Sequence, residues 1–291
     1  MTFLGTCGSP RLGLVDETTA LALDITALAP DAPADCDALV AGGEHTLERV
    51  RTLISSASGS GWLPLESLVL APPLRRPGKI MAIGLNYRDH AEEQNIEPPP
   101  APLMFAKFAS SIVGPEAPVE IPPASSRIDY EVELAVIIGR RGRMISPEAA
   151  RDHIFGYTII NDVTARDLQR SDRQWVRAKS FDTFCPMGPA VVTVDALEFP
   201  PQRDIEMRVN GEVRQRSNTR RMIFDVPTLV SWLSEAFTLE PGDIISTGTP
   251  AGVGVFRNPP VFLTEGDVME ASIDGLGVLR NPVTHRPPGR P

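Results

Sequence analysis

The stretch that decides the fold is Tyr130-Glu131-Val132-Glu133-Leu134-Ala135-Val136-Ile137-Ile138-Gly139. It is largely apolar apart from its two glutamates and rich in β-branched residues, which predicts a buried β-strand. Side chains alternate between the two faces of a strand, so Glu131 and Glu133 share one face, which continues into apolar Ala135 and Ile137. Two carboxylates at the start of a buried strand repel each other, so they must either protonate or share a cation.

Further strand patterns lie on both sides of this stretch. Apolar runs over Lys79–Leu85 and Phe155–Asn161 predict two more buried strands. The segment Asp204–Gln215 alternates apolar and polar residues and contains Asn210-Gly211, a dipeptide typical of a tight β-hairpin. A helix is expected after Asp225, which is a good capping residue. Together these patterns predict an α+β fold that is rich in β-structure.

A proline-rich stretch divides the chain. Residues 1–72 carry short strand patterns and a helical pattern over Thr46–Ser56, which predicts a small N-terminal α+β domain. Residues 73–77 are interpreted as a Pro-rich linker. Residues 78–283 form the larger predicted domain, which contains the strands described above, and residues 284–291 are expected to form a peripheral tail.

Composition and charge exclude several classes of protein. Of the 291 residues 42% are hydrophobic and 22% are charged, which is typical of a globular protein. The formal net charge of −9 argues against a nucleic-acid-binding surface, since phosphates must be met by clustered Lys and Arg. No apolar run approaches the ~18 residues of a membrane-spanning helix, and no signal-peptide pattern is present. The three separated cysteines, Cys7, Cys36 and Cys185, favour a reducing compartment, so we expect a cytoplasmic protein without membrane or nucleic-acid partners.

Three carboxylates are candidate metal ligands. Glu131 and Glu133 come from the decisive strand, and Asp162 directly follows the apolar run that ends at Asn161. Carboxylate oxygens are hard ligands that suit Mg²⁺, Mn²⁺ or Ca²⁺. The residues alone leave two alternatives open: a solvated edge strand for the glutamates, and a helix-capping role for Asp162.

A histidine and a glutamate form a candidate catalytic base. If a helix begins near Asn86 and is capped by it, His90 and Glu93 lie three residues apart on one face, where the carboxylate orients the imidazole and raises its basicity. The alternative is a surface histidine beside acidic neighbours. Lys179 either stabilises an anionic intermediate or extends along the surface as a solvated lysine. The glycine-rich loop 246–254 could hold a carboxylate through its backbone N–H groups and threonine hydroxyls.

In their order along the chain, these motifs resemble those of the fumarylacetoacetate hydrolase family. The matching stretches are KIMAIGLNYRDHAEE, YEVELAVIIG, GYTIINDVTARDLQ, AKSFDTFCPMGP and STGTPAGVG, which run from Lys79 to Gly254. The resemblance implies a mixed β-sandwich roll preceded by a small N-terminal domain, usually assembled as a homodimer. It also implies a divalent metal, Mg²⁺ or Mn²⁺, held by Glu131, Glu133 and Asp162.

The resemblance assigns roles to further residues. It implies that His90 and Glu93 act together as the catalytic base and that Lys179 is the active-site lysine. Contacts with a small keto-acid substrate are expected from Arg88, Gln169 and Thr249, with Arg88 meeting a second carboxylate.

The implied activity is metal-dependent hydrolysis of a C–C bond in a small diketo acid. Candidate substrates are an acylpyruvate, a fumarylpyruvate-like acid or a diketo sugar acid, as in the breakdown of aromatic compounds or sugar acids. His90 would deprotonate a water that attacks the distal carbonyl, and the leaving carbanion would be held as an enolate by the metal and Lys179. The same enolate serves isomerisation of a 2-hydroxy-diene-dioate or decarboxylation of an oxaloacetate-type acid, which stay open as alternatives. A module that binds metal and ligand without turnover is a further alternative.

Overall fold

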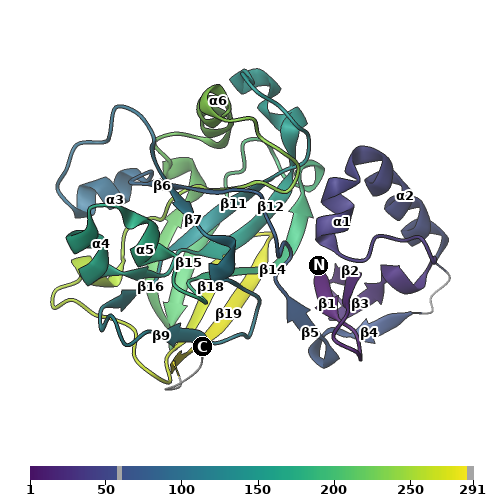
Figure 1. The fold of residues 1–291 in the computed structure, drawn as a ribbon, viewed down its shortest axis with the longest axis horizontal. Coiled ribbons are helices and arrows are strands. Elements are labelled where there is room, and N and C mark those ends of the chain that lie inside the picture. Colours follow the sequence, from purple (N-terminus) through teal and green to yellow (C-terminus); the bar gives the residue numbers. More distant parts are fainter. Residues whose placement is uncertain (58–60, 287–291) are drawn as a thin grey trace.

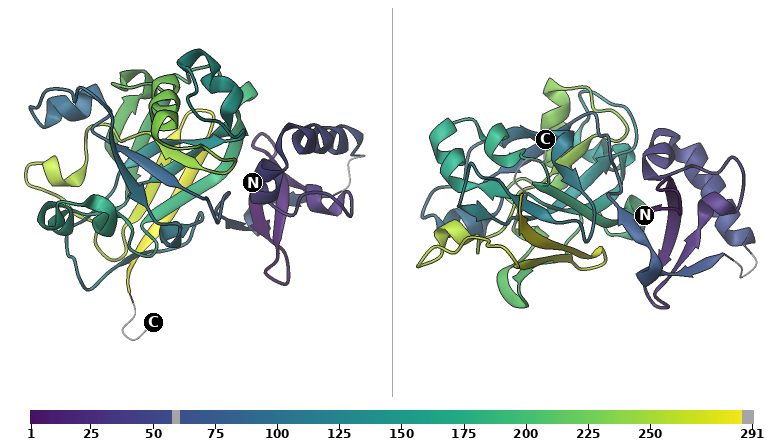
Figure 2. Two further views of the ribbon diagram at one scale, coloured as in Figure 1. Left: turned by 45° about the horizontal axis from the view of Figure 1, so that its top comes forward. Right: turned by 60° about the horizontal axis from the view of Figure 1, so that its bottom comes forward.

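The computed structural model describes residues 1–57 and 61–286. A small body formed by the N-terminal residues lies beside a large body formed by the rest (Figure 1). Two further views show that the small body contacts one side of the large body without wrapping around it (Figure 2). The fold class predicted from the sequence, a strand-rich α+β fold, is confirmed.

The small body is a five-stranded sheet covered by two helices. Its strand order is β4-β3-β2-β1-β5. The elements are β1 (Thr2–Leu4), β2 (Pro10–Asp16), β3 (Leu21–Asp24), α1 (Cys36–Ala41), α2 (Gly43–Ser56), β4 (Trp62–Pro64) and β5 (Val69–Ala71). The helix predicted over Thr46–Ser56 is confirmed and begins earlier, at Gly43. The sheet ends at Ala71, just before the predicted linker, and the division into separate domains at that point stays a prediction.

Two sheets form the large body. The first has seven strands in the order β7-β6-β17-β11-β12-β14-β8, and the second has five in the order β16-β15-β18-β19-β9. The strands of the first sheet are β6 (Ile80–Gly84), β7 (Leu103–Lys107), β8 (Ile112–Val113), β11 (Val132–Ile138), β12 (Ile154–Asn161), β14 (Cys185–Thr193) and β17 (Ile244–Ser246). Those of the second are β9 (Val119–Ile121), β15 (Asp204–Val209), β16 (Glu212–Asn218), β18 (Val268–Ile273) and β19 (Gly277–His285).

Short elements complete the large body. A two-stranded ribbon pairs β10 (Ile128–Asp129) with β13 (Thr164–Ala165). The α-helices are α3 (Arg88–Glu93), α4 (Arg166–Asp172), α5 (Trp175–Lys179) and α6 (Val226–Ala236). No helix in residues 1–57 and 61–286 combines the length and the apolar character that a membrane crossing needs.

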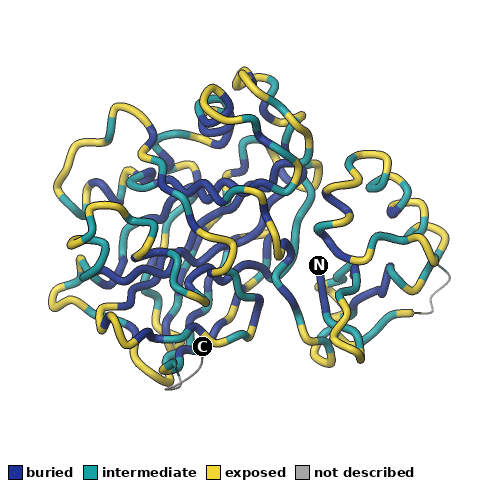
Figure 3. The backbone as a smooth tube through the Cα atoms, viewed as in Figure 1, coloured by how far each residue is buried: buried dark blue, intermediate teal, exposed yellow. Residues whose placement is uncertain are grey.

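The decisive strand β11 is buried on both faces (Figure 3). On one face Leu134 belongs to the main core, together with side chains of β12, β15, β18, β19 and α6. On the other face Ala135 and Ile137 belong to a second core cluster that includes Leu12 and Val40 of the small body. The two glutamates share this second face, because side chains alternate along the strand. They therefore lie at the N-terminal end of this face, ahead of Ala135 and Ile137, and are buried themselves.

Two local predictions are confirmed. Asn210-Gly211 joins β15 to β16, and both residues have positive φ values, 53° and 77°, as a tight hairpin turn requires. Asp225 caps α6, and its carboxylate accepts the Thr228 N–H at 3.0 Å.

Candidate active site

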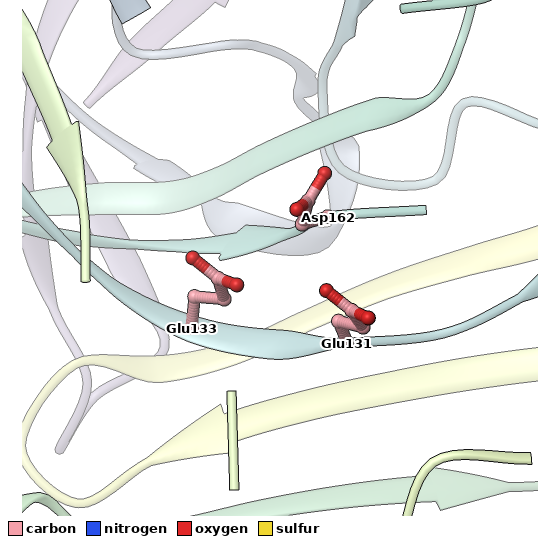
Figure 4. Close-up of side chains that lie close together, drawn as sticks. All are labelled: Glu131, Glu133 and Asp162. Carbon is pink, nitrogen blue, oxygen red and sulfur yellow. The ribbon is translucent and has the colours of Figure 1, made fainter. Parts of the chain in front are cut away.

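The three predicted metal ligands lie close together where two central strands of the seven-stranded sheet meet, at the start of β11 and just after the end of β12 (Figure 4). Glu131 precedes β11, Glu133 lies on it, and Asp162 directly follows β12. Val132 pairs with Asn161 across the two strands, which brings Asp162 beside Glu131, and the Asp162 N–H donates to the Glu131 carbonyl at 2.8 Å. One carboxylate oxygen of each ligand lies within 4.8 Å of the others. All three side chains are buried, which excludes the solvated edge strand that the sequence left open.

Buried cations surround these carboxylates. Lys179 Nζ donates to Glu131 Oε2 at 2.8 Å and to Asp162 Oδ2 at 2.6 Å. Burial opposes its charge, but the carboxylates of Asp162 and Glu131 raise the pKa of Lys179, so it stays an ammonium. Arg166 Nη2 lies 2.6 Å from Glu131 Oε1. Lys179 is therefore a member of the buried cluster and not a solvated surface lysine.

Lys107 belongs to the same cluster, and the sequence did not predict it. Its side chain is fully buried on β7, and its Nζ donates to Asp162 Oδ1 at 2.7 Å and to the Lys179 carbonyl. The available signal was a lone lysine between Phe105 and Phe108 at the end of an apolar strand. Lysine is almost never fully buried unless it is paired, so such a position indicates a nearby carboxylate.

The two glutamates differ in protonation. Burial alone raises the pKa of each, but at Glu131 the charges of Lys179 and Arg166 outweigh burial and lower the pKa to about 2. At Glu133 burial, reinforced by the negative charges of Asp162 and Glu131, raises the pKa to about 8. Without a metal, Glu131 is therefore a carboxylate near neutral pH, whereas Glu133 holds a proton.

The donor set fits a divalent metal. Glu133 accepts from two neutral donors, the Ser246 hydroxyl at 2.5 Å and the Gly248 N–H at 3.0 Å, and no cation among the described residues is hydrogen-bonded to it. The buried carboxylates of the cluster are Asp129, Glu131, Glu133 and Asp162, and its buried cations are Lys107, Arg166 and Lys179. Once Glu133 gives up its proton to bind a metal, four carboxylates against three cations leave one negative charge, which a divalent ion converts to one positive charge. Hard oxygen ligands suit Mg²⁺ or Mn²⁺, and the positive balance suits an anionic substrate.

His90 and Glu93 form the predicted pair on α3. Glu93 Oε2 lies 3.1 Å from His90 Nδ1, and Glu93 Oε1 accepts the Gly252 N–H at 2.9 Å. The His90 side chain is only 8% exposed, and its ring centroid lies 5.8 Å from that of Phe256. The histidine is therefore held in place from two sides and is not a solvated surface residue.

Asn86 does not cap α3, contrary to expectation. The helix begins at Arg88, with Tyr87 before it. The Asn86 side chain donates instead to the carbonyls of Thr247 at 2.7 Å and Phe224 at 3.0 Å, and it accepts the Phe224 N–H at 2.8 Å. These partners are far away in the sequence, so the local pattern could not indicate them.

A cavity of about 390 Å³ is lined both by His90 and by the carboxylates of Glu131 and Glu133. It is lined by Ile83, Gly84, Leu85, His90, Gln94, Phe105, Glu131, Glu133, Arg166, Gln169, Arg170, Trp175, Lys179, Thr249, Val255 and Phe256. Gln169 and Thr249, two of the three expected substrate contacts, line this cavity, and their contact with a substrate stays a prediction. Arg88 is exposed and does not line the cavity, so its position gives no support to the expected contact.

Arg166 and Asp129 link the carboxylate cluster to a loop at the cavity, and neither was singled out from the sequence. Arg166 Nε donates to Asp129 Oδ2 at 2.8 Å. Asp129 also accepts the N–H groups of Gly254 at 2.7 Å and Val255 at 2.9 Å. Through Asp129, the loop that carries Phe256 is thereby linked to Arg166, the cation that lies against Glu131.

Comparison with known proteins agrees with this geometry. Residues 79–284 match the family model described as fumarylacetoacetate (FAA) hydrolase C-terminal. The chain is 46% identical to the mitochondrial oxaloacetate tautomerase fahd2 of Xenopus laevis over 277 residues, which cover 94% of the chain and 86% of that relative.

Solved structures share the whole fold. A fumarylacetoacetate hydrolase from Exiguobacterium antarcticum superposes with a TM-score of 0.85 at 40% identity, covering 98% of both chains. A 2-hydroxyhepta-2,4-diene-1,7-dioate isomerase from Mycobacterium marinum superposes with a TM-score of 0.75 at 34% identity, covering 99% of this chain and 98% of the other. The activities in these names differ, so the fold they share does not by itself identify the reaction.

Proposed function

The chain belongs to the fumarylacetoacetate hydrolase family, and on that premise we propose that it is a divalent-metal-dependent enzyme that interconverts the keto and enol forms of a small 2-keto dicarboxylate such as oxaloacetate. The observation that carries the proposal is one cavity lined both by His90 and by two candidate metal ligands, Glu131 and Glu133. A keto–enol tautomerase needs these two features together: a base for the proton and a site that stabilises charge on the oxygen.

His90 is the proposed acid–base group. Its Nδ1 is engaged by Glu93, so proton exchange with the substrate falls to Nε2. Glu93 is itself fixed by the Gly252 N–H, which holds the imidazole in one orientation. Nε2 would take the proton from the carbon next to the keto group and pass it, directly or through solvent, to the keto oxygen to form the enol; the reverse transfer from oxygen to carbon regenerates the keto form.

Glu131, Glu133 and Asp162 are the proposed metal ligands. When held there, a divalent metal supplies Lewis acidity that polarises the keto oxygen of the substrate. Lys179 and Lys107 keep the carboxylate of Asp162 in place through one oxygen each. Gln169 and Thr249 line the same cavity and are the proposed hydrogen-bonding partners of the substrate's polar groups.

Two considerations favour tautomerisation over C–C hydrolysis. The similarity to an oxaloacetate tautomerase extends over 94% of the chain at 46% identity. Tautomerisation also needs only the base and the charge-stabilising site that line the cavity, whereas hydrolysis needs a positioned water and a leaving group as well. Hydrolysis of an acylpyruvate is the second candidate, because an imidazole held by a carboxylate is equally suited to deprotonate water.

A substrate panel tests the proposal. The purified protein, depleted of metal and then supplied with Mg²⁺ or Mn²⁺, is mixed with enol oxaloacetate, and the loss of enol absorbance is followed with and without EDTA. Metal-dependent acceleration without a change in mass supports tautomerisation. Release of CO₂ indicates decarboxylation, and formation of pyruvate and a carboxylic acid from an acylpyruvate indicates hydrolysis. No acceleration of the oxaloacetate tautomerisation by the metal-loaded protein would overturn the proposal.

A further inference from the structure

The positive charges deep in the cavity are already paired. Lys179 is bonded to Glu131 and Asp162, and Arg166 lies against Asp129 and Glu131. Neither cation is free to neutralise a second carboxylate at the far end of a substrate.

Arg170 differs from these cations. It stands in the last turn of α4, lines the same cavity and is exposed. Within residues 1–57 and 61–286 its guanidinium has no hydrogen bond, ion pair or ring contact, whereas Arg177 close by is paired with Asp172 at 2.6 Å. A free guanidinium on a cavity wall is suited to bind a carboxylate through two parallel N–H donors.

We infer that Arg170 binds the second carboxylate of the substrate and makes the cavity selective for 2-keto dicarboxylates over 2-keto monocarboxylates. The inference rests on the proposed function, because it takes the keto-acid end of the substrate to lie at Glu131 and Glu133. It also transfers to Arg170 the role that the sequence suggested for Arg88, which does not line the cavity.

The surroundings of Arg170 support this role. Gln169 and Trp175 line the cavity beside it, and the Trp175 ring packs edge-on against Phe105 with ring centroids 5.4 Å apart. This apolar wall can cover the carbon chain between the two carboxylates. The chain carries a net charge of −9, so a dianionic ligand needs a local cation to offset the general repulsion.

The test measures binding as well as turnover. Titration calorimetry on the Mn²⁺-loaded protein compares 2-oxoglutarate with 2-oxopentanoate, two ligands of equal carbon number that differ in the second carboxylate. In the wild type we expect the dicarboxylate to bind more tightly. Arg170→Gln should weaken dicarboxylate binding about tenfold and leave monocarboxylate binding within about twofold, because one charge-assisted contact is lost.

Two matched variants serve as controls. Arg173→Gln removes an exposed arginine three residues further on that does not line the cavity, and Arg88→Gln removes the arginine suggested by the sequence. Both should bind the two ligands as the wild type does. Equal binding of the two ligands by the wild type, no binding of the dicarboxylate, or equal weakening of both ligands in Arg170→Gln would overturn the inference.

The two proposals fail in different experiments. If the metal-loaded wild type does not tautomerise oxaloacetate, the proposed function is wrong, whichever of the two 2-keto acids binds more tightly. If it does so and Arg170→Gln raises KM for oxaloacetate no more than Arg173→Gln, the proposed function stands and the role of Arg170 is wrong.

Discussion

Lys179 Nζ lies 2.6 Å from Asp162 Oδ2, and the opposite carboxylate oxygen of Asp162 is held by a second lysine, Lys107, at 2.7 Å. Both lysines are buried, so each charge in this group depends on the others for its solvation. Removing Lys179 or Asp162 therefore combines a loss of chemistry with a loss of stability. A substitution that changes metal binding without removing a buried ion pair needs a candidate ligand whose hydrogen-bond partners are neutral. Glu133 meets this condition.

Glu133→Gln should separate metal binding from folding. The glutamine keeps an oxygen that can accept from Ser246 and Gly248, so we expect the free energy of unfolding to change by less than about 1 kcal/mol. Loss of one charged ligand should weaken Mn²⁺ binding at least about tenfold. Calorimetric titration and urea unfolding measure the two effects, with exposed Glu212→Gln as the control. Wild-type Mn²⁺ affinity in Glu133→Gln would contradict the ligand assignment.

Metal affinity should rise with pH. Burial, followed by the charges of Asp162 and Glu131, raises the pKa of Glu133 to about 8 in the metal-free protein. A metal binds the ionised carboxylate, so binding near pH 7 should release about one proton, and affinity should increase up to about pH 8 before it levels off. Titrations in two buffers of different ionisation enthalpy count the protons. Equal observed enthalpies in both buffers would show that Glu133 is already ionised.

Gly252→Ala should disturb the base without touching the metal ligands. A Cβ at this position would lie 2.1 Å from the Arg214 carbonyl oxygen, and the backbone φ is +103°. The loop must move, which removes the N–H that fixes Glu93, so we expect turnover to fall at least about tenfold while Mn²⁺ affinity is retained. Gly266→Ala, with φ +89° and open space around it, reports the effect of backbone strain alone. Equal activity of the two variants would argue against a positioning role for the loop.

Lys107→Met should destabilise the protein strongly. The substitution leaves one carboxylate oxygen of Asp162 without its ion-pair partner in a fully buried position, which costs about 3–5 kcal/mol. Lys79→Met is the matched control, since Lys79 pairs with Asp243 at 2.6 Å but is 33% exposed, and its loss should cost less. Urea unfolding compares the variants. A smaller loss for Lys107→Met than for Lys79→Met would show that Lys107 is not essential to the cluster.

The sequence predicted the features that depend on local patterns. Alternation along β11 placed Glu131 and Glu133 on one face, and helical spacing placed His90 near Glu93, as the structure shows. The hairpin at Asn210-Gly211 was also predicted, because its turn chemistry is local.

Features that depend on long-range pairing were not predictable. The hydrogen-bond partners of Asn86 lie more than 130 residues away in the sequence. The local sequence therefore predicted a helix cap, whereas the Asn86 side chain bonds to two distant segments. Lys107 and Asp129 acquire their roles only when distant strands bring carboxylates and cations together. No sequence pattern distinguishes Arg88 from Arg170 as a cavity residue. The folded chain shows that Arg170 lines the cavity and that Arg88 does not. The expected homodimer stays a prediction, which light scattering of the purified protein tests.

In the proposed mechanism His90 moves a proton of the substrate in a cavity that is also lined by the candidate metal ligands Glu131 and Glu133. The most direct measurement compares wild type and His90→Ala, both with Mg²⁺ bound, for the interconversion of enol and keto oxaloacetate. We predict that His90→Ala loses about 10²- to 10⁴-fold in rate while its metal affinity matches that of the wild type. Retention of the wild-type rate by the metal-loaded His90→Ala variant would contradict the claim.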